Sequence, residues 1–122
     1  MRTSLKILVV DDDEVIRTVT VSLLEVYGFT NVFSANDGDV ALELLVVGGD
    51  YELVISDYNM PKMDGLQLLE AIRKSEQLRD IKVVIVTGLG DLSALRAAGA
   101  DAVLRKPFPY EDLKAIIAEM FP

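Results

Sequence analysis

The chain has 122 residues, a length that suits one domain with a core of its own. Its hydrophobic fraction of 51% and net charge of -8 indicate a globular protein without a basic face for nucleic acid. The absence of cysteine and histidine excludes disulfides, structural zinc sites and histidine-dependent catalysis. No apolar stretch approaches the roughly 18 to 20 residues of a membrane span, and no signal peptide is visible, so we expect a soluble, cytoplasmic domain without membrane partners.

Five short apolar runs rich in valine, isoleucine and leucine recur along the chain. They cover residues 5–10, 31–35, 53–56, 83–86 and 102–104. The stronger runs are apolar almost throughout rather than alternating, which is typical of strands buried on both faces of a parallel sheet.

Helical patterns fill the spaces between these runs. The first helix is indicated by apolar residues at helical spacing, namely Val15, Ile16, Val19, Leu23 and Val26, and Gly28 is placed to stop it. Similar patterns follow over residues 40–45, 66–72 and 113–120, whereas residues 91–98 predict the weakest helix, about two turns long at best. The alternation predicts an α/β fold, a (βα)5 parallel sheet with right-handed crossovers, and one unit over residues 1–122.

Carboxylates follow two of the apolar runs. Asp11, Asp12 and Asp13 come after the first run, and Asp57 ends the third before a loop rich in proline and glycine. A carboxylate at the end of a buried strand is a poor choice for packing, but open α/β sheets present their working residues at this edge. The pattern predicts a divalent-metal site with one carboxylate left to react. Asp13 is better explained as a favourable charge at a helix N-terminus, and Asp64 as a helix cap.

Thr87 and Lys106 stand at the ends of the fourth and fifth runs. In the order 2-1-3-4-5, which is known for doubly wound folds and is not worked out from these residues, all of these groups line one crevice. The chemistry that fits is phosphoryl transfer. Mg²⁺ prefers oxygen ligands, a carboxylate can act as nucleophile, and a lysine with a hydroxyl can hold phosphoryl oxygens.

The chain resembles a response-regulator receiver domain of two-component signalling over its entire length, with a likeness to chemotaxis regulators. The matching motifs are Ile7-Leu8-Val9-Val10-Asp11-Asp12, Asp57-Tyr58-Asn59-Met60-Pro61 with Met63-Asp64-Gly65, Val86-Thr87, and Lys106-Pro107-Phe108. The resemblance implies a flavodoxin-like doubly wound sandwich of three layers with sheet order 2-1-3-4-5. It also implies a phosphorylation-dependent switch in a phosphorelay, which catalyses only its own phosphorylation and dephosphorylation.

The resemblance also assigns roles at the metal site. Asp57 would accept a phosphoryl group from the phosphohistidine of a sensor histidine kinase or a phosphotransfer protein. Asp12, Asp57 and the backbone carbonyl of Asn59 would ligate Mg²⁺, or Mn²⁺ in its place. Asp11 would help to hold the metal, chiefly through water.

Two further residues and one surface complete the implied switch. Lys106 would pair with the phosphoryl group, and its bond to Pro107 is expected to be cis. Thr87 would move to hydrogen-bond the same group. The output would be binding of another protein by the fourth helix, fifth strand and fifth helix, as a monomer or as a dimer linked to phosphorylation.

The chain departs from the family pattern near this output surface. Val103 stands three positions before Lys106, where the family usually has an aromatic ring, so the usual swing of a ring is not expected. The span from Thr87 to Lys106 is about three residues short, which predicts a fourth helix shortened by nearly a turn.

Three further departures concern the ends of helices four and five. Gly88 and Gly90 predict a mobile loop after Thr87 and a loosely held fourth helix. Leu89 is placed to shield the phosphoryl group from water. Pro109 replaces the usual serine or threonine cap of the last helix, so that helix start is less well satisfied.

Two alternatives stay open. Asp11-x-Asp13-x-Val15 is similar to the first motif of haloacid-dehalogenase-like phosphatases, with Asp11 as nucleophile. The chain is short for that family, lacks a late acidic pair and leaves Asp57 without a role. The second alternative is a pseudo-receiver that binds partners without phosphorylation, which the altered Val103 and fourth helix support.

Overall fold

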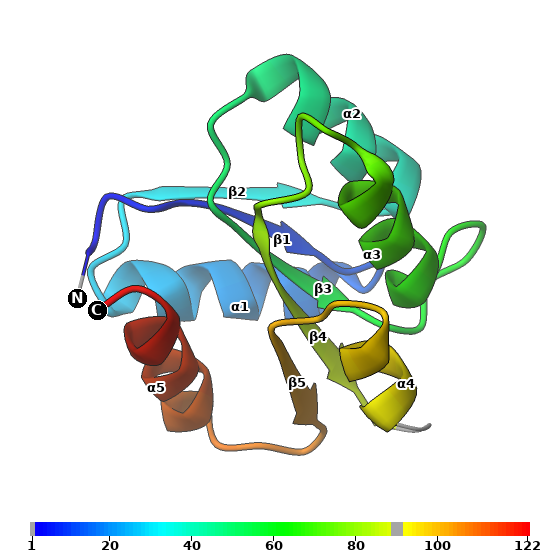
Figure 1. Cartoon of the computed structure of the whole chain (residues 1–122). Helices are drawn as coiled ribbons and strands as arrows, with labels where there is room; N and C mark the ends of the chain where they lie inside the picture. Colours follow the sequence, from blue (N-terminus) through cyan, green and yellow to red (C-terminus); the bar gives the residue numbers. More distant parts are fainter. Residues whose placement is uncertain (1, 89–91) are drawn as a thin grey trace.

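A computed structural model describes residues 2–88 and 92–122. Strands and helices alternate five times along the chain (Figure 1). The strands are β1 (Lys6–Val10), β2 (Asn31–Ala35), β3 (Leu53–Asp57), β4 (Lys82–Thr87) and β5 (Ala102–Arg105). The helices are α1 (Glu14–Val26), α2 (Gly38–Gly48), α3 (Gly65–Lys74), α4 (Leu92–Ala97) and α5 (Tyr110–Met120). The predicted (βα)5 fold is confirmed.

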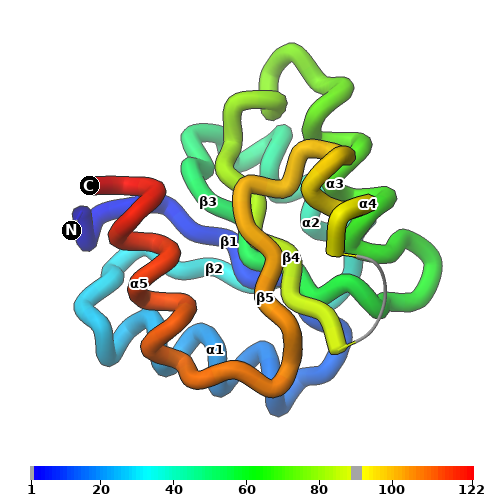
Figure 2. Tube along the Cα trace, turned by 60° about the horizontal axis from the view of Figure 1, so that its bottom comes forward, coloured from blue at the N-terminus to red at the C-terminus, as the bar shows by residue number. Residues whose placement is uncertain are grey.

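The five strands form one parallel sheet in the order β2-β1-β3-β4-β5. Helices α1 and α5 cover one face, and α2, α3 and α4 cover the other (Figures 1 and 2). Because the strands are parallel, their carboxyl ends share one edge, where Val10 lies opposite Ser56, Asp57 opposite Val86, and Thr87 opposite Arg105. This register brings the predicted site residues to a single edge of the sheet.

The hydrophobic core consists of two apolar layers, one on each face of the sheet. Every residue of β3 is buried, because this central strand is covered from both sides, as its nearly continuous apolar sequence predicts. Leu69 and Ile72 of α3 pack in one layer, and Leu113 and Ile117 of α5 pack in the other. Burial of each such side chain contributes on the order of 1.5 to 3 kcal/mol to folding.

The predicted first helix is confirmed as α1, but most of the apolar residues that predicted it are exposed rather than packed in the core. Val15 is 71% exposed and Val26 is 79% exposed, whereas Leu24 is fully buried. Two stripes at helical spacing run along this helix, and periodicity alone does not say which one packs on the sheet. Gly28, with φ +102°, follows the end of the helix in the predicted stopping position.

Side chains cap three of the helices, and one start is uncapped. Asp13 accepts hydrogen bonds from the first turn of α1, Asp37 does the same for α2, and Asp64 forms a capping box with Gln67 at α3. Pro109 precedes α5 without a side-chain cap. The roles predicted for Asp13, Asp64 and Pro109 are therefore confirmed.

Within the described residues, helix α4 has six residues and one buried side chain, Leu95, in agreement with the prediction of about two turns at best. Leu89 and residue 90 of the loop predicted to be mobile lie outside the described residues. Over residues 2–88 and 92–122, no helix combines the length and apolarity needed to cross a membrane.

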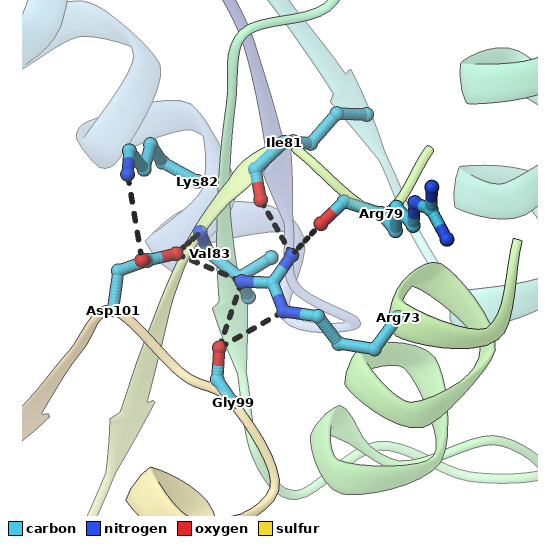
Figure 3. A network of polar contacts seen from close by, with 7 residues as sticks. All are labelled: Arg73, Arg79, Ile81, Lys82, Val83, Gly99 and Asp101. Atoms are coloured by element: carbon cyan, nitrogen blue, oxygen red, sulfur yellow. Dashed lines mark hydrogen bonds and ion pairs between the residues drawn. The ribbon is translucent and has the colours of Figure 1, made fainter. Parts of the chain in front are cut away.

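A polar cluster ties together the opposite, amino edge of the sheet (Figure 3). The guanidinium of Arg73, at the end of α3, donates all five of its N–H groups. The acceptors are the backbone oxygens of Gly99, Arg79 and Ile81 and the Asp101 carboxylate. Because these groups precede β4 and β5, one side chain fixes helix α3 to the entries of both strands.

Candidate functional site

Three carboxylates meet at the carboxyl edge of the sheet. Asp57 is the last residue of β3, and Asp11 directly follows the neighbouring strand β1. One oxygen from each of Asp11, Asp12 and Asp57 lies within 4.8 Å of the others. Asp11 is 7% exposed and Asp57 is 9% exposed, so two of the three charges lie largely away from water. The sequence prediction that these residues come together is confirmed.

Both oxygens of Asp57 are engaged by neighbouring groups. The Lys106 ammonium donates to Oδ1 at 2.7 Å, and the Asn59 amide donates to Oδ2 at 3.2 Å. Lys106 follows β5, where its own amide donates to the Thr87 carbonyl at 2.8 Å, and its bond to Pro107 is cis, as predicted. The ends of β3, β4 and β5 therefore fix the position of the Asp57–Lys106 pair.

Burial and crowding of like charges set the electrostatics of the site. Burial raises the pKa of Asp11, the hydrogen bond from the Asp13 amide opposes this, and the charge of Asp57 raises the pKa further. For Lys106, burial alone lowers the pKa, but the hydrogen bond from Lys106 to Asp57 and the surrounding carboxylates outweigh burial and raise it. One lysine thus neutralises only part of the acidic charge, and this leaves a site that favours a cation.

The residues predicted for the site line one cleft of about 500 Å³. Its walls include every site residue expected from the sequence: Asp11, Asp12, Asp57, Asn59, Thr87 and Lys106. Thr87, at the end of β4, is 3% exposed. The possible metal ligands that lie close together here are carboxylate oxygens. This set suits a hard cation such as Mg²⁺ or Mn²⁺ and offers no thiolate or imidazole for zinc or copper.

Two features of the site were not predicted from the sequence. The guanidinium of Arg17 donates to the Asp11 carbonyl at 2.9 Å, which ties α1 to the acidic loop. A second, mostly apolar cavity of about 270 Å³ opens beside Asp57 and is lined by Ile16, Phe108 and Tyr110 among others. No sequence motif marks either feature, and the cavity depends on how α1 and α5 share one face of the sheet.

Comparison with known proteins gives a consistent result. Residues 7–118 match the family model of the response regulator receiver domain. The chain is 38% identical to a probable chemotaxis protein CheY of Rhizobium etli, over 96% of this chain and 92% of that protein. It is 37% identical to the chemotaxis protein CheY of Pseudomonas aeruginosa, over 96% of each chain.

Solved structures agree with these sequence relatives. A response regulator receiver protein from Pseudomonas putida superposes with a TM-score of 0.87 at 25% identity, over 98% of this chain and 99% of that one. The receiver domain of a Pseudomonas aeruginosa sensor histidine kinase, with magnesium coordinated in its active-site cleft, gives 0.84 at 28% identity. That match covers 95% of this chain and 96% of the other.

Receiver domains are signalling switches of two-component systems, in which they interact with histidine kinases and output domains. The family model spans most of the chain, the fold has the family's strand order, and the predicted motifs meet in one cleft. The chain belongs to the response-regulator receiver family.

Proposed function

We propose that Asp57 accepts a phosphoryl group from the phosphohistidine of a histidine kinase or phosphotransfer protein, with Mg²⁺ bound in the same cleft. The observation that carries the proposal is the convergence of three carboxylates within 4.8 Å around an Asp57 oxygen held 2.7 Å from Lys106. Structural packing does not require this costly grouping of charges at the end of a buried strand.

The residues present fit the metal. Asp11, Asp12 and Asp57 supply carboxylate oxygens that lie close together, and the Asn59 carbonyl belongs to the loop that directly follows Asp57. When bound, Mg²⁺ would neutralise charge on the phosphoryl oxygens. Asp12, Asp57 and the Asn59 carbonyl would ligate it directly, and Asp11 would hold it chiefly through water.

In the transfer, a carboxylate oxygen of Asp57 attacks the phosphorus of the donor. An oxygen–phosphorus bond forms while the bond from phosphorus to the imidazole nitrogen breaks, and the electron pair of that bond stays on the imidazole. Lys106 holds its ammonium against the oxygens that gain charge, and Thr87 donates its hydroxyl to the new phosphoryl group. The protein's part is therefore positioning and charge stabilisation.

The phosphorylated state is read by an output protein on the surface formed by α4, β5 and α5. Val103 is buried in the core on the α4 side of the sheet, and valine has no ring that could change its exposure. The signal therefore passes through Thr87 and the short α4 as a shift in population. We infer a cytoplasmic switch that turns over no separate substrate and acts as a monomer or as a phosphorylation-linked dimer.

Intact-mass measurement after incubation with Mg²⁺ and a small phosphodonor tests the proposal. Wild type should gain one phosphoryl group, and Asp57→Asn should gain none. Asp11→Asn should still form the adduct, though more slowly, because it alters metal binding and leaves the nucleophile in place. Omission of Mg²⁺ should have the same effect as the loss of Asp57.

The same samples separate the alternatives. A pseudo-receiver would show no adduct in any sample, although it would still bind its partners. A phosphatase of the haloacid-dehalogenase type would turn the donor over in an Asp11-dependent manner and would be indifferent to Asp57. Asp13 would serve that reaction poorly, because its carboxylate accepts from the Val15 and Ile16 amides as the cap of α1.

A further inference from the structure

The loop after Asp57 is closed into a ring. It runs from Tyr58 to Gly65, and the Gly65 amide donates to the Tyr58 carbonyl at 2.7 Å. Gly65 is required at this closure, because a Cβ there would lie 2.7 Å from the Asp57 carbonyl oxygen. Asn59, whose carbonyl is the proposed metal ligand, belongs to this ring.

The ring also contains a strained turn. Lys62 has φ +66°, a left-handed value that side chains other than glycine rarely adopt. The Met63 amide closes the turn by donating to the Pro61 carbonyl at 2.8 Å. Such a conformation persists when the surrounding structure over-determines it, so other contacts must hold Met63 in place.

Helix α2 supplies such a contact at its first residue, Gly38. A Cβ at Gly38 would lie 2.9 Å from Met63 Cβ, 2.8 Å from its Cγ and 2.9 Å from its Sδ. The bare backbone of Gly38, which is buried, is therefore covered by the Met63 side chain. We call this contact the Gly38–Met63 seat.

We propose that the Gly38–Met63 seat is a positioning device for the metal site, which holds the ring so that the Asn59 carbonyl faces the carboxylates. Gly38 and Met63 act through Asn59 and touch neither metal nor phosphoryl group. The inference rests on the proposed Mg²⁺ site and adds to it a requirement from a different element, helix α2.

Rotation of the Met63 side chain cannot relieve a clash at the Gly38–Met63 seat. A Met63 rotamer change moves Cγ and Sδ, but Cβ moves only with the backbone. A methyl group at Gly38 therefore pushes the Met63 backbone. Because the Tyr58–Gly65 hydrogen bond closes the ring, the peptide planes inside it must absorb the shift, and that of Asn59 is among them.

Two variants test the seat from opposite sides by Mg²⁺ titration calorimetry. Gly38→Ala adds the clashing methyl, and Met63→Gly removes the side chain that occupies the seat. Each should weaken Mg²⁺ binding roughly tenfold, as the loss of a supporting group around a metal site typically does. Their double variant should bind no more weakly than the poorer single variant, because the added methyl then meets open space.

Gly48→Ala is the matched control, because Gly48 ends the same helix and its added Cβ would meet the Tyr51 ring at 3.2 Å and the Lys6 ammonium at 3.7 Å, and no residue of the ring from Tyr58 to Gly65 is among these neighbours. It should leave the Mg²⁺ dissociation constant unchanged. Amide exchange in the metal-free protein gives a second readout, in which Met63→Gly should speed exchange within residues 59–63 more than it speeds exchange in the buried strands, where only the loss of global stability from the smaller side chain acts.

The outcomes separate this inference from the proposed function. Wild-type protein that binds no Mg²⁺ overturns both. Wild-type binding with Gly38→Ala within twofold of it overturns the seat alone. The seat is also overturned if the losses of Mg²⁺ affinity in Gly38→Ala and Met63→Gly add fully in the double variant, because two independent losses would add. If Gly38→Ala does not fold, Met63→Gly alone decides through the dissociation constant and the exchange rates.

Discussion

At the amino edge of the sheet, Arg73 gives each of its five N–H groups a fixed acceptor (Figure 3). At the carboxyl edge, by contrast, the three carboxylates of Asp11, Asp12 and Asp57 lie together, and the ion pair that they form within residues 2–88 and 92–122 is that of Asp57 with Lys106. The first cluster balances its donors and acceptors within the protein. The second has more negative charge than the protein neutralises, so it gains from a cation or a ligand that arrives from outside.

Similar polar groups therefore have different roles at the two edges of the sheet. A network in which every polar group has a partner holds its side chains in one geometry. A cluster with unneutralised charge lowers the stability of the protein but can bind a cation. The Arg73 network also anchors the loop that follows α4 through the Gly99 carbonyl. Motion of the output surface is therefore expected at the end of α4 near Thr87 rather than at its Gly99 end.

The largest expected effect in stability comes from Mg²⁺ itself. At a hundredfold excess over its dissociation constant, Mg²⁺ should raise the free energy of unfolding by about 2.7 kcal/mol through binding to the folded state. Asp12→Asn should lose most of this gain, and Arg73→Met should keep all of it, because only the first removes a ligand. Urea unfolding with and without Mg²⁺ measures the difference, and an equal gain in both variants would contradict the separation of the two edges.

Loss of the Arg73 network should be nearly as large. Arg73→Met leaves three backbone carbonyls without the guanidinium donor, whereas Asp101 keeps the Val83 amide and Lys82, and we expect a loss of about 2 kcal/mol, since the cluster is partly open to water. Arg73→Lys keeps the charge but not the fork and should lose about half as much. Phosphorylation of Asp57 should be unaffected. A normal midpoint in urea for Arg73→Met would show that water replaces the guanidinium.

A smaller effect tests whether every carboxylate at the carboxyl edge serves the site. Asp64 lies at this edge, yet its side chain accepts from the Gln67 amide at 2.9 Å as the cap of α3. Asp64→Ala should cost about 1 kcal/mol in stability. Mg²⁺ affinity should change less than twofold, and calorimetry that shows a tenfold loss would place Asp64 in the metal site instead. Asp64→Asn, which retains the capping oxygen, is the matched control.

The smallest effect concerns the uncapped start of α5. Pro109→Ser adds a capping oxygen worth about 1 kcal/mol, but it also loses the restriction that proline places on the unfolded chain, worth roughly 0.4 to 1 kcal/mol. The expected net change is a gain of about 0.5 kcal/mol or less. Thermal unfolding of Pro109→Ser beside Pro109→Ala, which lacks the cap, isolates the contribution of the hydroxyl.

Much of the fold and site could be predicted from the sequence, because both depend on local order along the chain. Continuous apolar runs identify buried parallel strands, and a carboxylate such as Asp57 that interrupts the end of one has few structural explanations. The shortened α4 and the capping role of Asp64 are equally local, since each follows from spacing or from residue type at a helix end.

The packing face of α1 could not be predicted in this way. Val15 and Leu24 each lie at helical spacing from other apolar residues of α1, yet of these two only Leu24 is buried. The choice depends on the position that α5 takes on the same face of the sheet. The acceptors of Arg73 could not be predicted either, because the carbonyls of Arg79 and Gly99 and the carboxylate of Asp101 come together only when β4 and β5 pair in the sheet.

The sequence by itself determined the strand–helix alternation, the strand-end residues and hence the family, because hydrophobic period and residue type are properties of the chain. Only the tertiary structure decided which groups touch. The 2.7 Å pair of Lys106 with Asp57 and the cover of Gly38 by Met63 join residues far apart in sequence. Such contacts arise when parallel strands align their ends, and no local rule specifies their distances.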